Sequence, residues 1–319
     1  MDAQFRNEQL LDIPFSVRSR NESENKAILW NKVGKRALPY AMIMPAMIVC
    51  LLFMVYPIIY MIYLSFYKWN MIGKMKFIGI ENYISLFTEP EFLQVLFQTC
   101  KFTLWTVIGF IVFGLLLALY LNKNTKINRM MQSFIFIPYI VPLISIAFIW
   151  MWIMDSEVGL LNYILNLFGI DCIKWLSDPK MAMNSLIIVN IWKGTGYYAL
   201  IFLSALQSIP SYLYEAAELD KANKFKVFFK ITLPMLSPTI FFLVLTATIA
   251  SFKVFETINI MTQGGPVNAT NTLVYYLYEY GFSFYKIGYA SAVGVVMMVI
   301  VGLLTIVYFG LLQKKVHYQ

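Results

Sequence analysis

The chain has 319 residues, of which 60% are hydrophobic, 17% are aromatic and only 13% are charged. Soluble globular domains carry about 25% charged residues, so this composition indicates a membrane protein. The net charge of +8 does not indicate a nucleic-acid-binding protein. The basic residues lie in short loops between apolar runs, where they orient membrane helices.

The first 36 residues are polar and mix charged residues with Ser and Asn. This composition predicts a cytoplasmic tail rather than a signal peptide. We expect a membrane domain to follow over 37–313, with a short cytoplasmic C-terminus over 314–319.

Six apolar segments have about the 20 residues that an α-helix needs to cross a bilayer. The segments are continuous rather than alternating, which favours helices over the strands of a β-barrel. The sequence therefore predicts an all-α polytopic membrane protein with six transmembrane helices, over 38–66, 102–121, 134–154, 185–206, 238–260 and 288–312.

Lys and Arg residues are unevenly distributed among the segments that flank these spans. They are frequent before the first span, between spans two and three, between spans four and five, and after the last span. Cytoplasmic loops carry such an excess of positive charge. Both termini and the segment 207–235 are therefore predicted to be cytoplasmic.

Two connections on the predicted outer side carry local signals. Thr88 and Pro90 predict the start of a short helix over 86–99 that lies on the outer surface. In the connection 262–272, the sequence Gly264-Gly265-Pro266 predicts a turn.

The cytoplasmic stretch EAAELDKANKFKVFFKITLP (215–234) is the one charged insert among the later spans. Ser208 or Ser211 is suited to cap a helix that runs through Ala222. A second short helix would carry three phenylalanines and end before Pro234. The pattern fits either an amphipathic helix on the lipid surface or a docking element for a soluble partner.

The same stretch resembles the EAA loop of bacterial ABC-importer permeases. The match comprises "EAA", Asp220, Ala222, Phe228, Ile231 and Leu233-Pro234. Four further pieces in chain order resemble the carbohydrate branch, the permeases similar to the larger maltose permease: FIGIENYISLF (77–87), WLSDP (175–179), NIWKGTGY (190–197) and TQGGP (262–266). The resemblance extends over about 38–311.

This sequence departs from the family pattern at one position, where Lys221 replaces the usual glycine. A lysine in the left-handed conformation costs about 1 kcal/mol, whereas asparagine tolerates that conformation better. We therefore expect the turn to move toward Asn223.

The resemblance implies a type I ABC importer fold in the bacterial inner, or plasma, membrane, with both termini inside. The chain would form half of a heterodimeric pore with a second permease subunit, surrounded by membrane lipid. A cytoplasmic ABC ATPase dimer would bind the ATP, and an extracytoplasmic solute-binding protein would deliver a small carbohydrate. The positions implied to contact the ATPase are Glu215, Ala216, Ala217, Asp220, Lys221 and Ala222.

Polar residues inside the predicted spans are candidates for function. Lys253 and Glu256 are three residues apart on one predicted helix, so they either neutralise each other or face the solute. Lys193 either snorkels to water or serves the solute, and Asn190 either bonds a neighbouring helix or faces the solute. Asn259 is a further candidate. The resemblance implies these solute-facing positions: Tyr139, Leu143, Asn190, Lys193, Gly194, Tyr197, Ala250, Ser251 and Val254.

The residue types and motifs in the sequence argue against several other functions. The three cysteines form no C-x-x-C pair, and the single histidine, His317, lies next to the C-terminal end. No G-x-x-x-x-G-K-[S/T] sequence occurs, so we expect no cofactor, metal site or catalytic residue in this chain. An importer of a phosphorylated polyol such as glycerol phosphate stays an alternative, although no arginine lies in any span. A secondary transporter, which needs membrane carboxylates and two similar halves, and an intramembrane enzyme are disfavoured.

Overall fold

The computed structural model describes residues 38–123 and 125–312. The predicted cytoplasmic tail over 1–36 and the C-terminus over 314–319 lie outside the described residues. The chain divides into two units, Met1–Tyr60 and Met61–Gln319, each of which is treated by itself below.

In the first unit, residues 38–60 are helical. The segment Leu51–Val55 has π-helical hydrogen bonding (η1) and leads into α3 (Tyr56–Leu64). Every residue from 38 to 60 is exposed, and nearly all are apolar. A helix that is apolar on all sides is stable only in an apolar environment, so this segment is the first membrane span.

The second unit begins with a small structure at one end of the long helices. Strands β1 (Tyr67–Lys68) and β2 (Lys76–Phe77) pair antiparallel, with Tyr67 opposite Phe77, and α4 (Glu81–Thr88) follows. The buried Asn82 side chain donates hydrogen bonds to the carbonyls of Ser65 (2.7 Å) and Tyr67 (3.1 Å). Asn82 of the FIGIENY sequence therefore fixes α4 against Ser65 and the first residue of β1.

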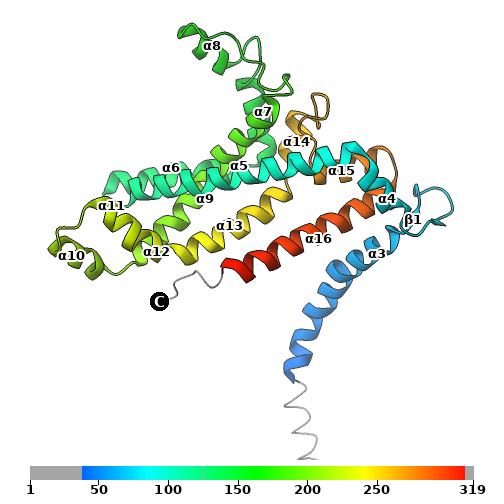
Figure 1. Cartoon of the computed structure of the whole chain (residues 1–319), viewed down its shortest axis with the longest axis horizontal. Coiled ribbons are helices and arrows are strands. Elements are labelled where there is room, and N and C mark those ends of the chain that lie inside the picture. The colour runs from blue at the N-terminus through cyan, green and yellow to red at the C-terminus, as the bar shows by residue number, and fades with distance from the viewer. Residues whose placement is uncertain (1–37, 124, 313–319) are drawn as a thin grey trace, which may run out of the picture. The chain divides into compact units, whose positions relative to one another are not determined.

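Four long helices form the centre of this unit: α5 (Pro90–Leu121), α9 (Ala182–Ser208), α13 (Ser237–Phe252) and α16 (Ile287–Leu312). Helix α5 packs along α9 and against α13, and α13 also contacts α16 (Figure 1). The predicted spans over 185–206 and 288–312 lie within α9 and α16.

The predicted surface helix over 86–99 is wrong as a separate element. Helix α5 does begin at Pro90, but it continues unbroken to Leu121. Two polar residues of α5 that precede the predicted span bond the loop before α15 (Leu273–Tyr278) and the first residue of α15. The Gln98 amide donates to the Asn268 carbonyl (2.8 Å), and the Thr99 hydroxyl accepts from the Leu273 N–H (3.0 Å).

The third predicted span is not one helix. It consists of α6 (Lys126–Ile140) and α7 (Leu143–Ile153), which are bent by 95° at Val141–Pro142. Proline disfavours the helical conformation of the residue before it, and Val141 is extended (φ −63°, ψ 135°). Within the described residues, five helices are long and apolar enough to cross a membrane, or six spans if this bent pair counts as one.

The fifth predicted span is also interrupted. Helix α13 ends at Phe252, Lys253 to Phe255 are not helical, and α14 (Glu256–Met261) continues beyond them. The predicted turn at Gly264 follows, where φ is +77°, a conformation that glycine adopts readily. Then come α15, the π-helical segment η3 (Glu279–Ser283) and α16.

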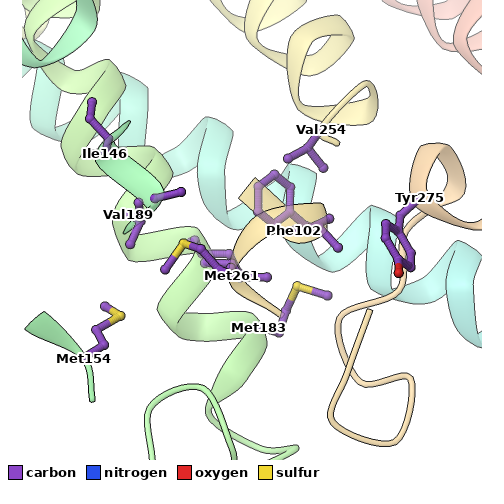
Figure 2. Close-up of a cluster of buried hydrophobic side chains, with 12 residues drawn as sticks. Phe102, Ile146, Met154, Met183, Val189, Val254, Met261 and Tyr275 are labelled. Atoms are coloured by element: carbon purple, nitrogen blue, oxygen red, sulfur yellow. The ribbon is translucent and has the colours of Figure 1, made fainter. Parts of the chain in front are cut away.

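An apolar cluster holds the two interrupted spans in place. Figure 2 shows Phe102 of α5, Ile146 of α7, Met183 and Val189 of α9 and Met261 of α14 in one buried group. Val254, from the break between α13 and α14, belongs to the same cluster. Because close packing drives the association of helices in a bilayer, this cluster fixes the segments beside both breaks.

Candidate solute pathway and coupling loop

A cavity of about 310 Å³ lies beside both helix breaks. The predicted positions Leu143, Asn190, Ala250, Ser251 and Val254 all line it. Lys253 and Glu256, which the sequence offered as candidates, line it too, and the cavity also receives side chains that the sequence did not assign to it: Phe102, Thr106, Phe110 and Phe255. The α5 residues were missed because that predicted span carried no charged or amide group at those positions.

Asn190 joins α9 to α14. Its amide donates to the Leu186 carbonyl (2.9 Å) within its own helix and to the Thr257 hydroxyl (3.3 Å). The interhelical hydrogen bond that the sequence offered as one alternative is therefore present. Because Asn190 also lines the cavity, the bond fixes the side chain at the cavity wall.

Lys193 of α9 reaches the C-terminal end of α6. Its ammonium donates to the carbonyls of Tyr139 (2.9 Å) and Pro138 (3.3 Å) and lies 5.3 Å from the centroid of the Tyr139 ring. In a continuous helix the Pro138 carbonyl would bond the N–H of residue 142, but Pro142 has none. Lys193 therefore replaces the backbone donors that α6 loses at its end.

The remaining predicted positions on α6 and α9 form an aromatic row. The Tyr139 and Tyr197 rings stack with centroids 4.6 Å apart, and Phe110 stacks on Tyr198 at 4.3 Å. A side chain at Gly194 would collide with the Phe110 ring, which lines the cavity. Gly194 thus gives Phe110 its position, and the structure does not bring Gly194, Lys193 or the two tyrosines into the cavity lining.

The expectation that Lys253 and Glu256 share one helix is wrong. Lys253 follows the last residue of α13, and Glu256 is the first residue of α14. No ion pair within 4.0 Å joins the two residues, which are both described and exposed. Each charge instead complements the dipole of the helix end that it occupies, positive at a C-terminus and negative at an N-terminus.

The predicted coupling loop, 207–235, begins with α10 (Ser211–Leu219). The expected helix through Ala222 is three residues too long, and neither Ser208 nor Ser211 is its N-cap, because Pro210 occupies that position. The N–H groups of Lys221 and Ala222 bond the carbonyls of Glu218 and Ala217, both at 2.9 Å. This pair of bonds is a Schellman C-cap, which needs a left-handed residue at position 221.

Lys221 is that left-handed residue, with φ +50°. The predicted shift of the turn to Asn223 is therefore wrong. Asn223 has φ −64°, and its side chain caps α11 (Lys224–Val227) by accepting from the Phe225 N–H (3.2 Å). The C-cap of α10 and the Asn223 N-cap of α11 form together because Lys221 adopts the strained left-handed conformation.

The second half of the coupling loop does not stop before Pro234. Helix α11 continues through the π-helical segment η2 (Phe228–Thr232) into α12 (Leu233–Met235). A wider π turn ahead of Pro234 accommodates the missing N–H of the proline. The Tyr214 and Thr232 hydroxyls bond at 3.2 Å and join α10 to η2.

The structure divides the six predicted ATPase-contact positions into two groups. Ala217 is buried and Ala222 is half-buried, so they face the protein. The exposed group is Glu215, Ala216, Asp220 and Lys221. Large apolar side chains are exposed on the same loop, at Tyr212, Leu219, Phe225 and Phe229.

At the opposite end of the long helices is a surface hollow of about 570 Å³. Tyr280 and Tyr289 contribute to its wall, and Lys286 lies 5.2 Å from the Tyr280 ring centroid. The β1–β2 hairpin supplies Lys68, Lys74 and Lys76, while Glu81 and Glu89 supply negative charge. No sequence signal indicated this hollow, because its segments are about 200 residues apart in the chain.

A polar network fastens the loop 262–272 beside this hollow. The Asn268 amide donates to Glu91 (3.0 Å), and the Tyr280 hydroxyl donates to the other oxygen of Glu91 (3.3 Å). The Asn271 amide is 3.5 Å from Glu279. Burial, and next the nearby Glu91 charge, raise the pKa of Glu279 above its ordinary value.

Comparison with known proteins gives consistent matches. Residues 110–318 match the family described as "Binding-protein-dependent transport system inner membrane component". The sulfoquinovosyl glycerol transport system permease protein of Agrobacterium fabrum is 36% identical over 288 residues, covering 90% of this chain and 94% of the relative. The sn-glycerol-3-phosphate transport system permease protein of Pectobacterium atrosepticum is 34% identical, covering 88% and 96%.

A solved structure has the same fold. It is a bacterial ABC transporter involved in the import of the acidic polysaccharide alginate, which matches with a TM-score of 0.79 and 24% identity over 90% of this chain and 98% of the other. The resemblance inferred from the sequence motifs is thus confirmed. The chain belongs to the family of inner-membrane components of binding-protein-dependent transport systems, and it is a membrane-spanning permease subunit of an ABC importer.

Proposed function

We propose that this chain forms half of the translocation pore of an ATP-driven importer of a carbohydrate or polyol derivative. The observation that carries the proposal is the cavity at the two broken spans. Broken helices expose backbone polar groups, which membrane proteins tolerate only inside the protein or beside a water-filled path. Asn190 and Ser251 add polar side chains to that path.

The cavity lining suits a sugar-like solute. Phe102, Phe110 and Phe255 offer aromatic faces to C–H groups, while Asn190 and Ser251 offer hydrogen bonds to hydroxyls. The names of two relatives give sulfoquinovosyl glycerol and sn-glycerol 3-phosphate as their solutes, which supports a sugar or polyol derivative here. A glycerol-phosphate importer is the second candidate.

The coupling loop would connect this pore to an ATPase. Its exposed Glu215 and Ala216 and its exposed aromatic residues offer a polar and apolar surface to a protein partner. ATP would bind to that separate ABC ATPase dimer, since the chain contains no phosphate-binding loop. A second permease subunit would complete the pore. An extracytoplasmic binding protein would deliver the solute at the end of the long helices where the surface hollow lies.

The test is uptake by the complete complex, reconstituted with its co-encoded permease, ATPase and binding protein. We expect uptake to require ATP and to fall when Asn190→Ala removes the amide from the cavity. The matched control is Asn184→Ala, on the same helix, where the amide bonds only the Lys180 carbonyl (3.3 Å) and does not line the cavity. ATP-independent uptake, or equal uptake by both variants, would contradict the proposal.

A further inference from the structure

Two lysines lie inside the membrane spans beside the helix breaks, and their surroundings differ. The Lys193 ammonium is held by two carbonyls and the Tyr139 ring. Lys253 lines the cavity, and in the described part of the chain its ammonium has no hydrogen bond, ion pair or aromatic partner. The Lys253 ammonium can therefore bind a group that enters the cavity.

Glu256 does not neutralise Lys253. The two side chains line the same cavity without an ion pair within 4.0 Å. The C-terminal dipole of α13 offsets only part of the cost of placing the Lys253 charge within a span. An unpaired ammonium beside a solute path, where its placement costs free energy, is expected to bind an oppositely charged group of the solute.

We propose that Lys253 binds an anionic group of the solute, so that the importer carries an acidic sugar or polyol derivative. A phosphate, sulfonate or carboxylate supplies the oxygen acceptors that an ammonium binds as a point charge. Asn190 and Ser251, which line the same cavity, would bind the neutral hydroxyls of that solute. This inference rests on the proposed function and assigns the charge of its solute.

The opposite charge of Glu256 fits this arrangement. A carboxylate only accepts hydrogen bonds, so it binds sugar or polyol hydroxyl groups and repels the anionic group. An acidic solute would therefore be oriented in the cavity, with its anionic group at Lys253 and hydroxyls toward Glu256.

The solute is identified first, by mass spectrometry of the molecule released from the purified co-encoded binding protein. Uptake of that molecule is then measured in proteoliposomes that contain the complete complex. We expect the solute to be anionic at pH 7. Lys253→Met should raise the KM for uptake about tenfold or more, because charge-assisted hydrogen bonds are roughly twice as strong as neutral ones. Lys253→Arg, which keeps the charge, should stay within about threefold of the wild type.

Lys101→Met is the matched control, since Lys101 is a half-buried lysine of α5 that does not line the cavity. If Lys253→Met does not assemble, Lys253→Gln tests the same charge with a polar side chain. A neutral solute, or an unchanged KM in the assembled variant, would overturn the assignment of Lys253. Absence of ATP-driven uptake by the wild-type complex would instead refute the proposed function, so the two failures are distinguishable.

Discussion

The Lys193 ammonium lies 2.9 Å from the carbonyl oxygen of Tyr139, where α6 ends at a 95° bend. A side chain of α9 thus completes the backbone hydrogen bonding of another helix. This relationship explains how a span interrupted by Pro142 persists in a membrane, where an unpaired carbonyl costs free energy.

Lys193→Met should destabilise the permease by about 1–3 kcal/mol, because it leaves the Pro138 and Tyr139 carbonyls without donors. The measurement is the thermal unfolding midpoint of the purified complex in lipid nanodiscs. Lys101→Met should show little change. Equal midpoints for the Lys193 variant and the wild type would show that water or lipid satisfies these carbonyls.

Lys221→Gly should stabilise the coupling loop by about 1 kcal/mol, because glycine adopts the left-handed conformation without the strain of a lysine. Hydrogen exchange of the Ala222 amide, which closes the C-cap, reports this change directly. Glu218→Gly, within α10, should have the opposite effect, since glycine weakens a helix interior. Faster exchange in Lys221→Gly would mean that the lysine side chain stabilises the turn.

The outer loop should lose protection as pH rises. Burial and the Glu91 charge raise the pKa of Glu279 above its ordinary value of 4.5. The folded state therefore binds more protons than the unfolded state between the ordinary and the raised pKa, and stability falls as pH rises through that window. Hydrogen exchange of the Asn271 and Leu273 amides, corrected for intrinsic rates, measures it. Glu279→Gln should abolish this pH dependence of amide exchange. If the pH dependence persists in the variant, a group other than Glu279 causes it.

Membrane orientation is open to a direct test. Reporter fusions at Thr125 and Lys221 should give a cytoplasmic signal, and fusions at Trp175 and Val267 an external one, because of the distribution of Lys and Arg. A cytoplasmic signal at Val267 would contradict the six-span topology.

Much of the fold could be predicted because a bilayer demands long continuous apolar helices. The fourth and sixth spans agree with α9 and α16 to within a few residues, and the turn at Gly264 follows from local chemistry. The breaks at Val141 and Lys253 were missed, since hydropathy does not register a helix end inside an apolar run. Pro142 was a visible signal for the first of them.

The site could be predicted only in part, because its geometry depends on contacts between distant helices. Of the positions that the family resemblance implied to face the solute, Leu143, Asn190 and Ser251 line the cavity, whereas Gly194 and Tyr197 do not. The role of Lys193 required both the bend after α6 and the position of α9, which no local pattern contains. The strain at Lys221 was mispredicted because the cost of a left-handed lysine is smaller than the gain from two capped helices.

Coupling of this pore to an ATPase through loop 207–235 is tested by ATP-driven uptake with matched loop variants. Ala216 is exposed, so Ala216→Trp should leave the fold intact while added volume separates a packed partner. Glu215→Ala should weaken the same contact by about 1.5–3 kcal/mol if it carries a charged hydrogen bond. Ala217→Trp should instead lower the stability of the permease itself, since Ala217 is buried. We expect Ala216→Trp to lose ATPase association and uptake together, with an unchanged unfolding midpoint and unchanged solute affinity of the binding protein. Normal association and normal uptake in Ala216→Trp and Glu215→Ala would contradict it.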